Sequence, residues 1–65
     1  MRNTRWEFLV MPSGVVLDCY EDVAIPVTLS VENFTHKGQA CKLVIAPNAR
    51  EGWAKVEEIK KEFCK

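Results

Sequence analysis

Apolar and polar residues alternate in short runs along the first two-thirds of the chain. Such runs predict β-strands, because successive side chains of a strand point to opposite faces of a sheet. The predicted strands cover residues 5–11, 15–20, 23–34 and 39–46. Residues 12–14 and 36–39 are of the types that favour turns, so the first two strands and the last two are each expected to form a hairpin.

The longest alternation runs through the predicted strand 23–34. Its apolar face consists of Val23, Ile25, Val27, Leu29 and Val31. The residues between them are small or polar, apart from Pro26, and would line the other face. Pro26 has no N–H to donate to a β-ladder, so it indicates an edge position or a bulge that splits this strand into two.

After Pro47 the period of the pattern changes to that of a helix, which is predicted for residues 49–64. Asn48 is a good N-cap residue, and Glu51 three positions later completes an arrangement like a capping box. The apolar stripe of this helix contains Ala49, Gly52, Trp53, Val56, Ile59 and Phe63. We expect Gly52 to allow a close approach to the sheet, and Trp53 to contribute most to the core.

These elements predict a single α+β domain, residues 1–65, in which a small antiparallel β-sheet of four or five strands precedes one amphipathic C-terminal helix. Two architectures fit: an open meander with the helix across one face, or a five-stranded SH3-like barrel closed by the helix. The first strand is apolar on both faces, with Leu9 and Met11 opposite Phe8 and Val10. A sheet of that kind is expected to be covered twice, so we predict a homodimer.

Composition places the chain among folded, non-membrane proteins. Hydrophobic residues make up 48% of it, too many for a disordered protein. No segment approaches the roughly 20 apolar residues that span a bilayer, and Glu7 interrupts the start before a signal-peptide pattern develops. Cys19, Cys41 and Cys64 are odd in number and widely spaced, which is not a secreted disulfide framework. We therefore expect a cytoplasmic protein.

The charges are unevenly distributed although their sum is zero. Residues 6–36 contain five acidic residues and no lysine or arginine, whereas residues 37–65 contain seven basic residues against four glutamates. The folded chain should therefore have an acidic and a mildly basic side. It lacks the clear cationic excess that binding along a phosphate backbone normally requires.

Four residues could act as zinc ligands or as parts of a nucleophilic site: Cys19, His36, Cys41 and Cys64. Structural zinc sites usually take two ligands from one short turn, and no two of these cysteines are close in sequence. His36 and Cys41 could meet across a turn, but no oxyanion hole is evident beside them. The three glycines are isolated, so there is no phosphate-binding loop. We expect no metal, no cofactor and no enzymatic activity.

The preferred hypothesis is a small non-enzymatic protein-binding or regulatory module that engages a basic surface of a partner protein. The residues expected to bind the partner are Asp18, Tyr20, Glu21, Asp22 and Glu32. Short proteins of neutral to acidic charge are common among inhibitors carried by viruses and plasmids. The hypothesis therefore includes an inhibitor of that type.

Two alternatives remain open. The first is a small β-barrel that binds nucleic acid through its N-terminal arm and the lysines of its second half. Its expected binding residues are Arg2, Arg5, Trp6, Lys37 and Lys42. The second is a purely structural subunit of a larger assembly, whose apolar side chains are covered by neighbouring chains.

Overall fold

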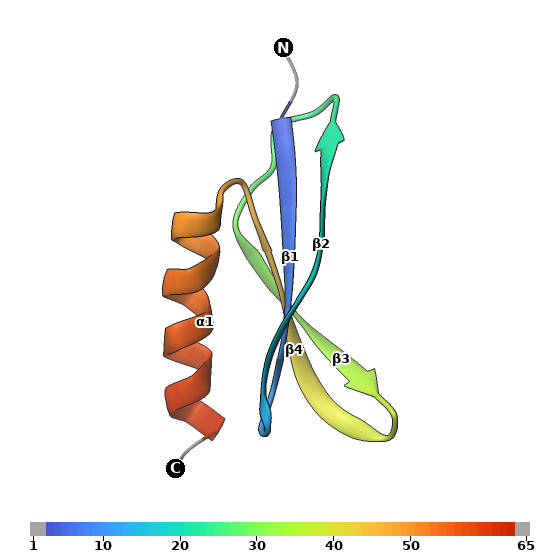
Figure 1. Ribbon diagram of the computed structural model, residues 1–65, viewed down its shortest axis with the longest axis vertical. Helices are drawn as coiled ribbons and strands as arrows, with labels where there is room; N and C mark the ends of the chain where they lie inside the picture. Colours follow the sequence, from blue (N-terminus) through green and yellow to red (C-terminus); the bar gives the residue numbers. More distant parts are fainter. Residues whose placement is uncertain (1–2, 64–65) are drawn as a thin grey trace.

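The computed structural model describes residues 3–63, except for the side chains of residues 17–19. Four strands precede one helix: β1 (Asn3–Met11), β2 (Gly14–Val23), β3 (Ser30–His36), β4 (Gln39–Ala46) and α1 (Ala49–Phe63). The predicted α+β class, antiparallel sheet and C-terminal helix are confirmed (Figure 1). Residue 64, the predicted end of the helix, lies outside the described residues.

The sheet is open, and its strand order is β2-β1-β4-β3. The two hairpins β1–β2 and β3–β4 lie side by side through β1 and β4, so that β2 and β3 form the edges. The predicted barrel does not form, and the order differs from that of a simple meander. The connection at residues 24–29 must cross from one edge of the sheet to the other.

The prediction of a strand over residues 23–34 was wrong for the middle of this segment. Residues 24–29 form no strand, and regular pairing begins again only at Ser30. Pro26 lies within this segment and cannot donate to a ladder. The alternation nevertheless has a structural basis, because Leu29 packs against the core, although Ile25 is largely exposed.

The β3–β4 turn follows the expected turn chemistry, but β2 contains an irregularity that the sequence did not reveal. In the β3–β4 turn, Lys37 and Gly38 have φ angles of 52° and 78°. Two positive φ angles in a two-residue loop are typical of a type I′ turn. In β1–β2, Glu7 pairs with Cys19 and Phe8 with Leu17, so Asp18 is the extra residue of a β-bulge.

The main core lies between α1 and the central strands. Phe8, Val10, Val44, Val56 and Ile59 are buried there, and α1 packs on β1 and β4. The predicted role of Gly52 is confirmed. A Cβ atom at this position would lie 2.7 Å from Cζ of Phe8 and closer still to Cε1.

Phe8, rather than Trp53, is the largest fully buried side chain, which corrects the prediction for Trp53. Trp53 remains 45% exposed. Because Gly52 has no side chain, the ring of Phe8 can lie against the helix backbone. The adjacent Trp53 then packs beside that ring at the margin of the core.

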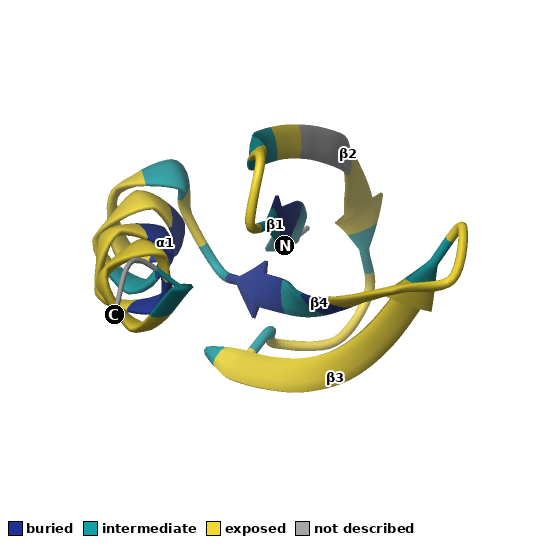
Figure 2. Cartoon of the chain, turned by 90° about the horizontal axis from the view of Figure 1, so that it is seen from below, coloured by how far each residue is buried: buried dark blue, intermediate teal, exposed yellow. Residues whose placement is uncertain are grey.

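The face of the sheet away from α1 is buried at its centre. Leu9, Cys41 and Ile45 lie on this face and are buried. Figure 2 shows the buried segments of β1 and β4 at the centre of the twisted sheet, between β2 and β3. Val16 and Phe34 on the same face are 48% and 44% exposed, and the homodimer stays a prediction.

The helix begins as the sequence predicts. Oδ1 of Asn48 accepts a hydrogen bond of 2.8 Å from the backbone N–H of Glu51, and Nδ2 of Asn48 donates one of 2.9 Å to Oε2 of Glu51. We expect Asn48→Ala to lower the free energy of unfolding by about 1 kcal/mol. Urea denaturation measures this loss. A decrease of the same size for Asn48→Ser would contradict the capping role, because serine caps equally well and brings no second carboxylate next to Glu51.

Candidate functional site

Four aromatic rings form a row from the outer edge of β2 to the helix, which we call the aromatic row. Tyr20 stacks on Trp6 with ring centroids 5.1 Å apart, and Trp6 stacks on Phe8 at 6.5 Å. Phe8 then meets Trp53 edge to face at 5.0 Å. The row is buried at its centre, but its end residues are 64% (Tyr20) and 45% (Trp53) exposed.

The aromatic row lies on the α1 side of the β1–β2 hairpin. The paired ends of these strands project beyond the first turn of α1 (Figure 1). Lys60 lines a hollow with the turn residues 12–14 of that hairpin. Trp53 precedes Lys60 by seven residues, about two helical turns, and so faces the same hairpin. Sequence reasoning missed Trp53 as a surface residue because helical periodicity placed it within the apolar stripe.

The predicted acidic residues are only partly brought together. Tyr20, Glu21 and Asp22 are consecutive exposed residues of β2. Alternation along the strand places Asp22 on the same face as Tyr20, and Glu21 on the opposite face. Glu32 lies on β3, at the other edge of the sheet. Asp18 is the bulge residue of β2, and its side chain lies outside the described residues.

Four of the five residues predicted for nucleic-acid binding lie in the described part of the chain, and these four do not form one surface. Arg5 is held by carboxylates, at 3.0 Å from Oε1 of Glu7 and 3.7 Å from Oε1 of Glu21. Trp6 is half-buried within the aromatic row. The other three residues are separated from these: Lys37 is in the β3–β4 turn, Lys42 is on β4, and Arg2 lies outside the described residues.

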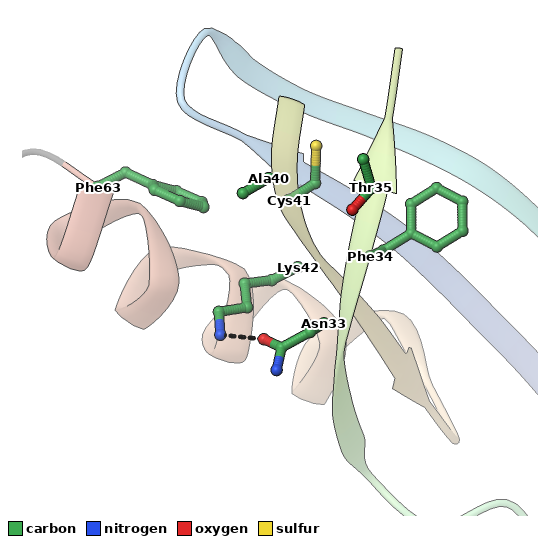
Figure 3. Close-up of a pocket in the computed structure, with 7 residues that line it drawn as sticks. All are labelled: Asn33, Phe34, Thr35, Ala40, Cys41, Lys42 and Phe63. Carbon is green, nitrogen blue, oxygen red and sulfur yellow. Dashed lines mark hydrogen bonds between the residues drawn. The ribbon is translucent and has the colours of Figure 1, made fainter. Parts of the chain in front are cut away.

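The second notable surface is β3, whose residues 30–35 are all exposed. Val31 is 40% exposed on the face toward α1, and Phe34 is 44% exposed on the other face. Figure 3 shows the ring of Phe34 pointing away from the side on which Nζ of Lys42 donates a hydrogen bond to Oδ1 of Asn33. Because α1 covers β1 and β4, this edge strand contributes little to the core.

A hollow of about 350 Å³ lies between α1 and β3. It is lined by Val31, Lys42, Lys55, Glu58, Ile59 and Glu62. Nζ of Lys55 is 2.8 Å from Oε2 of Glu58. The hydrogen bond and the positive charge of Lys55 lower the pKa of Glu58. Glu58 is exposed, so its carboxylate stays solvated, unlike the desolvated acids and bases that catalysis often uses.

The candidate metal ligands do not converge within the described residues, where no three His, Cys, Asp or Glu side chains form a group that could hold a metal ion. Cys41 is buried on β4, and its Sγ donates to the carbonyl oxygen of Gln39 at 3.3 Å. His36 lies at the end of β3. Cys64 and the side chain of Cys19 are outside the described part.

In the described part of the chain, no helix is long and apolar enough to cross a membrane. Comparisons of the chain with known protein families, with curated proteins and with solved structures give no match.

Proposed function

We propose that this protein is a small non-enzymatic protein-binding module that engages its partner through the aromatic row and the adjacent acid residues of β2. The observation that carries the proposal is the pair of exposed end rings, Tyr20 and Trp53, which the half-buried Trp6 and the buried Phe8 link. Stacking on Trp6 restricts the ring of Tyr20 before any partner binds, which lowers the entropy cost of binding.

The composition of this surface supports the proposal. Tyrosine and tryptophan are enriched among the residues that dominate binding energies, and charged groups usually surround them at the rim. Here Asp22 shares the face of Tyr20, and Glu21 lies at the same edge. The β1–β2 hairpin carries more acidic than basic residues, so a partner with a basic surface fits it best.

A regulatory role follows naturally from such a surface. A chain of 65 residues that covers a basic surface on a larger protein would block whatever that surface binds. We therefore propose inhibition as the mode of regulation, including inhibitors of the type carried by viruses and plasmids. The free thiol of Cys41 is consistent with the cytoplasm as the compartment.

Capture by the immobilised chain, followed by calorimetry with the purified partner, tests the proposal. We expect Tyr20→Ala to weaken binding about thirtyfold or more, as for a central anchor residue. Tyr20→Phe should keep most of the affinity, because it preserves the stacking on Trp6. Asp22→Lys should weaken binding more than Glu21→Lys, although both change the net charge equally.

Two results would contradict this function. One is an unchanged affinity of the partner for Tyr20→Ala and Trp53→Ala. The other is binding of duplex or single-stranded DNA at low salt that Lys37→Ala or Lys42→Ala reduces, which would favour the nucleic-acid alternative.

A further inference from the structure

The two edge strands differ in how well they could pair with another strand. β2 carries the bulge at Asp18 and exposed carboxylates at Glu21 and Asp22, and both features discourage edge-to-edge pairing. β3, in contrast, runs from Ser30 to His36 in unbroken register with β4 and has one acidic residue. β3 is thus the edge that is open to pairing.

The turn geometry shows which backbone groups of β3 are free. A two-residue type I′ turn is closed by a hydrogen-bonded residue pair, here His36 and Gln39. Hydrogen-bonded and non-hydrogen-bonded pairs alternate along an antiparallel ladder. Glu32, Phe34 and His36 therefore direct their N–H and C=O groups toward β4, whereas those of Val31, Asn33 and Thr35 point outward.

The geometry points to a second copy of this chain as the partner of β3, paired antiparallel about a two-fold axis at Phe34. In that register Phe34 lies opposite Phe34 of the other copy, as a non-hydrogen-bonded pair whose side chains are close. Glu32 lies opposite the other copy's His36, an imidazole that can donate an N–H to the carboxylate. Asn33 lies opposite Thr35 of the other copy, so that the outward N–H and C=O groups of the two residues can form hydrogen bonds with each other.

Charge favours this arrangement over one centred on Glu32. The start of β3 carries Glu32, whereas its end carries His36 and is followed by Lys37. Antiparallel pairing of two copies brings the acidic start of each strand to the basic end of the other. An axis at Glu32 would instead oppose two carboxylates, which is destabilising. This inference concerns the opposite edge from the proposed partner-binding surface and does not depend on it.

The expected dimer is weak and depends on concentration, because a short strand pair buries less surface than a standard interface. Light scattering over the micromolar to millimolar range should show the mass rising from the 7.4 kDa of one chain toward twice that value. We expect Phe34→Lys alone and Phe34→Glu alone to remain monomeric at the highest concentration. An equimolar mixture of the two should dimerise, since opposite charges then meet at the axis.

Three further variants separate pairing from folding. Asn33→Pro removes an outward N–H and should abolish the dimer, with circular dichroism showing that the fold is kept. Val16→Lys changes an equally exposed apolar residue on β2 and should leave the dimer unchanged, as should Tyr20→Ala. A wild-type chain that stays monomeric throughout, or a Phe34→Lys chain that still dimerises, would overturn the inference. So would a Lys and Glu mixture that stays monomeric.

Discussion

Phe8→Ala is expected to remove a large part of the free energy of unfolding of this protein. Phe8 is fully buried between α1 and the sheet, and it is the largest side chain of the core. Loss of a buried phenylalanine ring costs about 3–5 kcal/mol. The whole domain, at roughly 0.05–0.15 kcal/mol per residue, has a free energy of unfolding of only about 3–10 kcal/mol.

Tryptophan fluorescence during urea denaturation gives a direct measurement, because Trp6 and Trp53 both contact the ring of Phe8. Phe34→Ala is the matched control, since it also removes a phenylalanine ring, but from the exposed edge strand β3. We expect it to cost about 1 kcal/mol or less at low protein concentration. Equal losses for the two variants would show that the core is not centred on Phe8.

Local chemistry explains why much of the fold could be predicted from the sequence. The capping pair Asn48 and Glu51 fixes the start of α1 through contacts within one helical turn. The β3–β4 turn needs two positive φ angles, and Gly38 adopts one of them at little steric cost. In both places the residues that determine the structure are neighbours in the sequence, so their pattern is informative on its own.

The features that could not be predicted depend on contacts between distant segments. The β1–β4 pairing, which puts β2 and β3 at opposite edges, joins residues more than thirty positions apart. Because of this pairing, residues 24–29 have to cross the sheet, and the predicted strand 23–34 is interrupted there. The bulge at Asp18 has no glycine or proline to mark it in the sequence.

The candidate site shows the same limit. Tyr20, Glu21 and Asp22 were predicted together because they are consecutive, and the strand keeps them together. Charge is the only feature that suggests Glu32 as a partner-binding residue, and the sheet order places it at the other edge. Trp53 joins the aromatic row only through Phe8, a contact between the helix and the first strand that no local pattern contains.

Gly52→Ala is expected to destabilise the protein by about 1–2 kcal/mol, although the same change in an exposed helix would stabilise it by about 1 kcal/mol. The added Cβ would lie 2.7 Å from Cζ of Phe8, well inside contact distance. The ring cannot move aside cheaply, because Val10, Val44 and Val56 pack in the same fully buried cluster. Urea denaturation again measures the change in the free energy of unfolding. Ala54→Gly on the exposed side of α1 measures how much the difference in helix propensity between alanine and glycine contributes.

A double-mutant cycle identifies the contact responsible. Phe8→Leu shortens the side chain and removes the ring atoms nearest to position 52, so Gly52→Ala should cost less in that background. The coupling free energy should favour the double variant by about 0.5–3 kcal/mol, as for residues in direct contact. Strict additivity, or a gain in stability for Gly52→Ala alone, would mean that α1 does not lie against Phe8 as closely as the structure places it. That outcome would also remove the support for Trp53 at the end of the aromatic row.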